Sequence, residues 1–281
     1  MGIETTNPVT VGSPTKKTHY DKVFENTTWL VSVLQKAMTP FSGSTLLDNK
    51  LLQGHVQRPQ FSRASTNSIT ISPGIYALND GSTNRMCYWD SDLTYTFTNL
   101  TTVSTWCYLY LDESKITTNL LTATAFIDST IPSTYIPAKH GEYNAKDRCI
   151  LAVRSNTAGE IEEFHHSGEL VIIKEIVSYV EGTVATAWTT VSIAIPRFAQ
   201  RAMLNSHAYK ASTGTIAYAF WRPDGSTDNY HSIIGVSSAG ELNLNSYDVI
   251  TSTAQKIEIS ASTSILMMDI KTDGWYFPAG M

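Results

Sequence analysis

Charged side chains are scarce in this sequence of 281 residues, and the shortage excludes several classes of protein. Asp, Glu, Lys and Arg make up 16% of the chain, against about 25% in an ordinary soluble domain. With 20 basic and 25 acidic residues the net charge is −5. The positive footprint of a protein that binds nucleic acid or an anionic membrane surface is therefore missing. The apolar share of 42% still allows a packed core.

Long apolar runs, a leader and paired cysteines are lacking as well. Apolar stretches such as Leu170–Ile173 fall far short of the roughly 20 residues that cross a bilayer. The first residues have neither the basic nor the apolar region of a signal peptide, so we expect none. Cys87, Cys107 and Cys149 have no metal-ligand spacing and leave one thiol over in any disulfide scheme. We favour buried free thiols, with a single disulfide as the alternative.

Hydroxyl side chains replace the missing charge. The chain has 29 Ser and 36 Thr, and β-branched Thr suits a half-buried sheet. From about residue 66 onwards, apolar residues alternate with Thr and other polar residues, and turn residues separate the runs. Many short strands without helical patterns between them are typical of antiparallel sandwiches or barrels. The runs that predict strands are Ser68–Ser72, Leu93–Leu100, Thr105–Asp112, Cys149–Arg154, Leu170–Val180, Thr189–Ile195, Ala202–Tyr209, Thr215–Trp221, Ser232–Val236, Leu242–Ser246, Lys256–Ser260, Ile265–Ile270 and Trp275–Phe277.

One strong helix signal covers residues 14 to 38. Ser13 suits the N-cap and Pro14 the first helical position, and Thr39-Pro40 ends the helix. Its apolar stripe at spacings of three and four consists of Tyr20, Val23, Phe24, Thr27, Val31, Leu34 and Met38. A lone helix with one stripe must pack on a β-domain, on copies of itself or on another protein.

These patterns predict a mainly β protein in which an N-terminal amphipathic helix precedes two antiparallel β-sandwich or barrel-like domains. Residues 1–65 would form an extended anchor with the helix. Residues 66–182 would form the first β-domain and 183–281 a C-terminal β-sandwich, divided at a small, Thr-rich segment.

The best enzymatic candidates are the clustered residues Glu160, Glu162, Glu163, His165 and His166. A carboxylate and an imidazole on one strand face suit acid–base work or metal binding, but they supply at most two ligands. The preceding Asn156–Gly159 is a turn sequence, so we favour an exposed hairpin over a functional site. Gly-x-Ser-x-Gly, Walker A, G-x-G-x-x-G and H-E-x-x-H motifs are lacking. We expect neither an enzyme nor a metal or other cofactor.

A polar loop at Arg222–Asn229 allows three interpretations. Pro223-Asp224-Gly225 is a turn sequence, as are Asp80-Gly81 and Asp273-Gly274. A cation site is the second interpretation, although the alternation of an EF-hand loop is missing. Contact with a ligand is the third.

Aromatic residues gather in or beside the expected strands, as in Phe220-Trp221 and Trp275-Tyr276-Phe277. Core packing explains most of them, whereas outward-facing rings suit stacking on sugars or contacts between subunits. Candidates for contact with a receptor are Trp221, Asp224, Asp228, Tyr230 and Trp275.

Two stretches resemble virion proteins of tailed bacteriophages. The first joins Asn7–Gly12 (NPVTVG) to Pro14–Thr27 (PTKKTHYDKVFENT), and the second runs from Asp147–Ala152 (DRCILA) to Phe164. The resemblance implies a structural component of a tail fibre, spike, or head or neck fibre. Such a protein would be a homotrimer made in the bacterial cytoplasm, and its N-terminus would dock on the tail, neck or capsid. Three helices around an axis would bury Tyr20, Val23, Phe24, Val31 and Leu34.

Two functions from different classes follow. In the first, a fibre or spike subunit touches a host-surface glycan or protein with its C-terminal domain. In the second, an architectural adaptor or decoration protein connects virion parts and binds no receptor. An enzyme that degrades capsule comes third, since no repeat or acid pair favours it.

Overall fold

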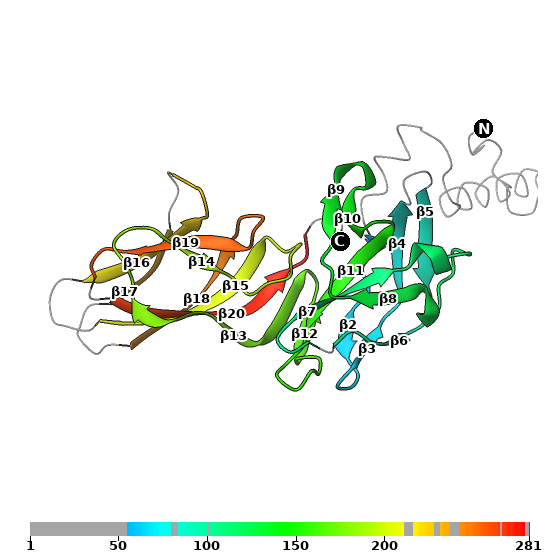
Figure 1. Cartoon of the computed structure of the whole chain (residues 1–281), viewed down its shortest axis with the longest axis horizontal. Coiled ribbons are helices and arrows are strands. Elements are labelled where there is room, and N and C mark those ends of the chain that lie inside the picture. Colours follow the sequence, from blue (N-terminus) through cyan, green and yellow to red (C-terminus); the bar gives the residue numbers. More distant parts are fainter. Residues whose placement is uncertain are drawn as a thin grey trace, which may run out of the picture.

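The structure is a computed structural model that describes residues 55–79, 84–100, 102–210, 216–227, 231–236, 242–264, 266–278 and 281. The predicted helix over 14–38 and most of the predicted anchor lie outside these residues. Strands make up 59% of the described residues, which confirms the mainly β class. Two lobes lie side by side along the long axis (Figure 1).

The N-terminal lobe contains the first twelve strands and three short 3₁₀ helices. The helices are η1 (Glu113–Lys115), η2 (Ala123–Ala125) and η3 (Pro137–Lys139). The strands are β1 (His55–Gln57), β2 (Phe61–Arg63), β3 (Ser68–Ile71), β4 (Gly74–Asn79), β5 (Asn84–Trp89), β6 (Leu93–Thr96), β7 (Trp106–Leu111), β8 (Phe126–Ser129), β9 (Thr134–Ile136), β10 (Gly141–Asn144), β11 (Asp147–Arg154) and β12 (Phe164–Ser167).

The C-terminal lobe contains the remaining strands. They are β13 (Leu170–Thr183), β14 (Thr189–Ser192), β15 (Arg201–Lys210), β16 (Ala217–Pro223), β17 (His231–Val236), β18 (Leu242–Ile250), β19 (Lys256–Ala261) and β20 (Leu266–Tyr276). Each predicted strand run coincides with one of the observed strands, apart from the last two runs, which form one strand.

One eight-stranded antiparallel sheet crosses both lobes, in the order β18-β15-β20-β13-β12-β2-β3-β6. The other sheets are β1-β4-β5, β8-β7-β11-β10-β9 and β14-β19-β16-β17. All four are open, so the expectation of a barrel-like domain is wrong for the part of the chain that the structure describes. The largest sheet extends from one lobe into the next instead of curling until its edge strands meet. The division of the chain at 182/183 stays a prediction.

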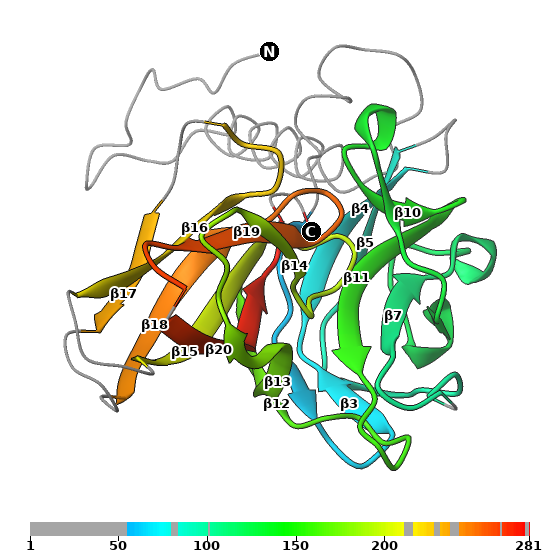
Figure 2. The ribbon, with the colours of Figure 1, turned by 60° about the vertical axis from the view of Figure 1, so that its left-hand side comes forward.

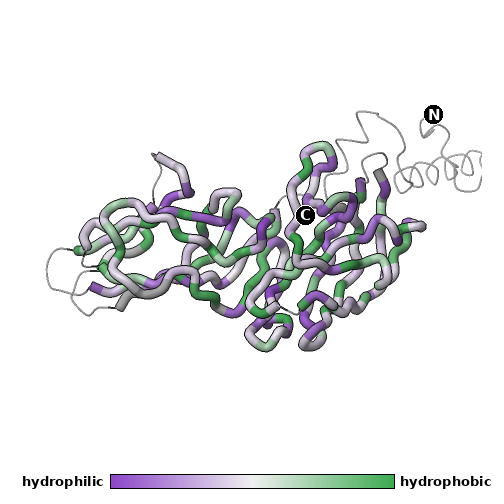
Figure 3. Tube along the Cα trace, viewed as in Figure 1, coloured by the Kyte–Doolittle hydropathy of each residue, from purple (hydrophilic) through white to green (hydrophobic). Residues whose placement is uncertain are grey.

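Two layers form the C-terminal lobe, where β18-β15-β20-β13 faces β14-β19-β16-β17 (Figure 2). Hydrophobic and hydrophilic residues are interspersed along the chain in this lobe (Figure 3). In β15 every second side chain from Ala202 to Lys210 is buried, as the period of two requires for a sheet with one face on the core. The inner faces meet through Leu204 and Ile270 from one layer and Ile259 from the other, all fully buried.

The centre of the N-terminal lobe is buried on both faces. Nearly all of β7 and β11 is inaccessible, so the polar face that the sequence pattern suggests for β7 is covered. The tyrosine hydroxyls there are hydrogen-bonded: Tyr110 donates to the carbonyl of Ile131 (2.7 Å), and Tyr108 accepts from the backbone N–H of Arg197 (3.1 Å). Burial of a tyrosine ring does not cost a hydrogen bond when its hydroxyl group has a partner in the protein.

The three cysteines are free and buried, which confirms the favoured interpretation. Burial raises the pKa of the Cys87 thiol to about 12. A protonated, enclosed thiol is chemically inert at neutral pH.

Asp273-Gly274 is not a turn but part of β20, which corrects the expectation from the sequence. Gly274 pairs with Ile172 of β13 and Met203 of β15. A Cβ on Gly274 would lie 2.7 Å from the carbonyl oxygen of Val171. Close approach of a neighbouring backbone, rather than a turn, explains this glycine.

Asp128 of β8 holds two sheets of the N-terminal lobe together. Its carboxylate is 3% exposed and accepts hydrogen bonds from Tyr95 Oη (2.7 Å), Thr98 N (3.1 Å) and Asn99 N (2.7 Å). Burial alone would raise the pKa of Asp128, but these hydrogen bonds outweigh burial and lower it. The ionised carboxylate therefore ties β8 to the loop that follows β6.

Replacing Gly274 with Ala should lower the free energy of unfolding by about 2 kcal/mol, because backbone must move to admit the methyl group. Urea denaturation measures the change. Gly235→Ala is the matched control, since its Cβ would meet side chains and not backbone: the ring of Tyr218 (2.9 Å), which is 41% exposed, and Ile216 at an ordinary contact distance (3.7 Å). Equal losses in the two variants would contradict the close-approach explanation.

Asp128→Asn should cost about 3 kcal/mol at neutral pH, because the amide group faces donors and the charge is lost. Since the pKa of Asp128 is lowered in the folded state, its contribution is present above the unfolded pKa of about 3.9 and disappears as pH falls through the folded value. The difference between wild type and variant should therefore shrink as the pH falls below about 3.9. Exposed Asp90→Asn serves as control, and parallel pH curves for wild type and D128N would refute the assignment.

Candidate functional site

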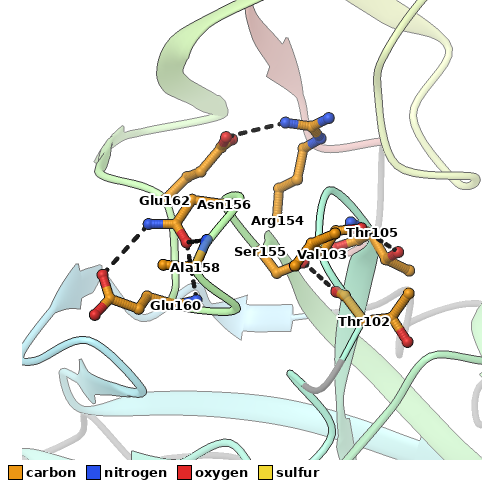
Figure 4. Close-up of polar contacts among 9 residues, drawn as sticks. All are labelled: Thr102, Val103, Thr105, Arg154, Ser155, Asn156, Ala158, Glu160 and Glu162. Atoms are coloured by element: carbon orange, nitrogen blue, oxygen red, sulfur yellow. Dashed lines mark hydrogen bonds and ion pairs between the residues drawn. The ribbon is translucent and has the colours of Figure 1, made fainter.

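The predicted acidic and histidine cluster forms a hairpin that is held by its own contacts (Figure 4). Asn156 Oδ1 accepts from the backbone N–H groups of Ala158 (2.8 Å) and Glu160 (3.0 Å). Gly159 has a φ of +76°, the left-handed conformation that a turn glycine supplies. This is the turn that the sequence predicts.

Glu162 is not solvated, in contrast to the exposed hairpin that we expected. It points to Arg154 in Figure 4 and forms an ion pair of 3.0 Å with it, the side chains being 12% and 16% exposed. The side chain of the adjacent Glu163 is exposed, and its Oε1 lies 3.8 Å from Nη1 of Arg63, a looser contact. Glu162 therefore anchors the hairpin, whereas Glu163 lies at the surface.

His166 is occupied by backbone groups at both ring nitrogens. Nδ1 accepts from the N–H of Phe61 (3.1 Å), so Nε2 carries the proton and donates to the carbonyl of Gly168 (2.9 Å). Burial lowers the pKa of His166 and keeps the ring neutral. Within the described ranges, no three His, Cys, Asp or Glu side chains gather as a metal site requires.

The loop after β16 contains the expected turn at Pro223–Gly225. The backbone N–H of Ser226 donates to the carbonyl of Pro223 (3.0 Å), and Gly225 has a φ of +80°. Asp224 accepts a hydrogen bond from Ser252 (3.3 Å). Asp228 and Tyr230 lie outside the described residues.

The two tryptophans proposed as receptor contacts are in the core. Trp221 is 7% exposed and stacks on His231, whereas Trp275 is fully buried. They belong to different sheets, so the structure does not bring them together. Neither ring is exposed enough to contact a receptor.

Trp275 instead lies where the two lobes meet. Its ring packs against Trp106 of the N-terminal lobe (centroids 6.5 Å apart) and against Phe198 (5.2 Å) and Phe277 (4.7 Å). Arg58 lies over the ring of Phe277 (4.7 Å) and donates from Nη2 to the carbonyl of Met281 (2.6 Å). Contacts between aromatic rings and the hydrogen bond from the Arg58 side chain to a main-chain carbonyl thus hold this junction together.

A cleft of about 610 Å³ opens beside this junction and is the candidate site. Its floor is apolar and buried, with Phe198, Phe277 and Met281 each at most 3% exposed. The wall from the N-terminal lobe includes Tyr135 and Glu142. The wall from the C-terminal lobe includes Arg201, Tyr276 and Ile250, and Glu169 also lines the cleft.

Glu142 brings a buried carboxyl group to the cleft. It is 7% exposed and accepts a hydrogen bond from Ser133 (3.0 Å). Burial raises the pKa of Glu142, although this hydrogen bond and the charge of Arg148 oppose the shift. Arg148 is fixed by hydrogen bonds to Tyr143 and to the carbonyl of Ala77.

Sequence reasoning missed nearly all of the cleft. Tyr135, Glu142, Glu169 and Arg201 come from separate strands and turns, and no spacing connects them. The aromatic run Trp275-Tyr276-Phe277 was the one local signal, and two of its members line the cleft.

Glu162→Ala should lower the free energy of unfolding by about 2 kcal/mol, because it leaves Arg154 half-buried without its partner. Glu163→Ala, one residue away, is the matched control and should change it by no more than about 0.5 kcal/mol, since that carboxylate is solvated. Chemical denaturation of both variants measures these changes in the free energy of unfolding. Similar effects would show that the ion pair does not anchor the hairpin.

Comparisons with known proteins name no relative. No family model and no curated protein matches the chain. A structure of the infectious bursal disease virus Gt strain is 13% identical over 88% of this chain and 76% of that chain, with a TM-score of 0.18. The VP2 subviral particle of infectious bursal disease virus is 14% identical over 89% and 78%, with a TM-score of 0.25. Scores of this size assign neither fold nor function to this chain. Among the described residues, no helix is long and apolar enough to span a membrane.

Proposed function

We propose that the chain is a structural subunit of a tailed-bacteriophage virion, of the fibre or spike kind, without catalytic activity. The observation that carries this proposal is the N-terminal run from Asn7 to Thr27, which resembles the opening of such proteins. Residues 1–65 would anchor the subunit on the tail, neck or capsid. Copies of the helix over 14–38 would assemble it as a trimer.

The body of the protein supports this role. A sheet shared by both lobes and an aromatic junction between them give a stiff body, which an appendage needs to transmit contact from its tip to its base. The low charge and the abundance of Ser and Thr suit a surface exposed on a particle.

An adaptor or decoration protein is the second candidate, favoured by apolar side chains on the surface. Val177, Leu244 and Ile250 are 55–64% exposed, and a neighbouring virion protein would cover them in an adaptor. The two candidates differ in whether the lobes lie free at the outside of the particle.

Deleting residues 1–40 should abolish incorporation into phage particles, as measured by immunoblotting of purified virions. The circular dichroism spectrum and the urea midpoint of the remaining chain should stay unchanged, because the described sheets begin at His55. Incorporation of the truncated chain would overturn the anchor assignment.

The double variant Val31→Asp/Leu34→Asp should convert a trimer into a monomer in analytical ultracentrifugation, because it places two charges on the apolar stripe. The matched control is Ser32→Asp/Gln35→Asp, which adds the same charges beside the stripe and should remain trimeric. Loss of the trimer in both variants, or in neither, contradicts the proposed helix packing.

A further inference from the structure

The cleft between the lobes has the dimensions of a small-ligand site. Its volume of about 610 Å³ falls within the roughly 300–1,000 Å³ of such sites, which favour domain junctions and combine an apolar floor with a few polar groups. The floor around Phe198 and Phe277 is held by the junction, so the cleft is formed before any ligand arrives.

One wall places an aromatic ring beside a carboxyl group. Tyr135 and Glu142 lie directly opposite each other in the β9–β10 ladder, so their side chains share a face. Tyr135 is 51% exposed, although most aromatic residues in the part of the chain that the structure describes are buried. Its open ring face offers a stacking platform next to an oxygen acceptor.

The other wall contains polar side chains that contact one another. Arg201 lies 4.1 Å from the centre of the Tyr276 ring and donates to Asp248 (2.6 Å). Tyr276 Oη also donates to Asp248 (3.0 Å). The guanidinium has further N–H donors beyond the one that Asp248 uses.

The charges in and next to the cleft balance, with Arg58, Arg148 and Arg201 against Glu142, Glu169 and Asp248. An anionic ligand would meet three carboxyl groups. A cationic ligand would find the rings of Phe277 and Tyr276 already covered by Arg58 and Arg201. A neutral ligand rich in hydroxyl groups fits, because hydroxyls donate to carboxylates and accept from guanidinium while an apolar face packs on a ring.

We propose that this cleft binds a neutral saccharide, with Tyr135 as the stacking platform and Glu142, Glu169 and Arg201 as hydrogen-bonding groups. The biological meaning rests on the proposed function, because a glycan of the host surface is the saccharide that a virion subunit meets. Binding by the isolated chain does not depend on that function.

Saturation-transfer NMR and titration calorimetry on the full chain test the inference with a defined set of probes. The neutral probes are glucose, galactose, mannose, rhamnose, N-acetylglucosamine, lactose and maltose, and the charged comparators are glucuronic acid and choline. At least one neutral probe should bind saturably. Tyr135→Ala should weaken that binding at least about tenfold, and Glu142→Gln should weaken it while the urea midpoint stays close to that of the wild type.

Tyr218→Ala is the matched control, since Tyr218 is similarly exposed (41%) but lies on β16, away from the cleft. It should bind as the wild type does. Failure of every neutral probe, binding of a charged comparator alone, or equal weakening by the two tyrosine variants overturns the inference. So does self-association of the chain that Tyr135→Ala abolishes, since a second copy would then occupy the cleft.

These outcomes are distinguishable from failure of the proposed function. A chain that binds a saccharide but is missing from purified virions contradicts the virion role alone. A chain that is present in virions but binds no neutral probe contradicts the saccharide site alone.

Discussion

The sheet that contains β13 connects the two lobes, and the rest of the structure depends on it. Within the C-terminal lobe, β13 pairs with β20. β13 also pairs with β12, which continues the sheet into the N-terminal lobe through β2 and β3. At the end of this ladder, Trp275 pairs with Val171 and Ala202, and its buried ring packs on Trp106. Bending one lobe against the other would break backbone hydrogen bonds and expose this aromatic cluster, both of which are costly.

The candidate site follows from this constraint. Because a shared sheet and an aromatic junction hold the lobes together, Tyr135 and Glu142 of one lobe line the same cleft as Arg201 and Tyr276 of the other. Preorganised walls lower the entropy cost of binding. The same stiffness suits a part of an appendage, in which a joint between the lobes would absorb any force applied at the tip.

Local patterns predicted twelve of the twenty strands that the structure describes and little of the site, for physical reasons. Alternation identified β15 because one of its faces lies on the core. It also identified β7 but suggested a polar face for a strand that is buried on both faces. The dipeptide Asp273-Gly274 suggested a turn, whereas Gly274 is needed for the close approach of a neighbouring strand. The hydrogen bonds of Asp128 and the placement of Tyr135 and Glu142 in the cleft depend on contacts between distant segments. No spacing along the chain encodes such contacts.

The Ser- and Thr-rich composition and the N-terminal run that resembles phage virion proteins support the proposed role, in which an anchor holds a stiff, weakly charged body on a particle. Cryo-electron microscopy of the intact virion tests this account most directly. We expect two-lobed density in several copies, with the lobes at the outer surface and the N-terminal segment directed into the particle. Virions in which this chain contributes no density would contradict the account.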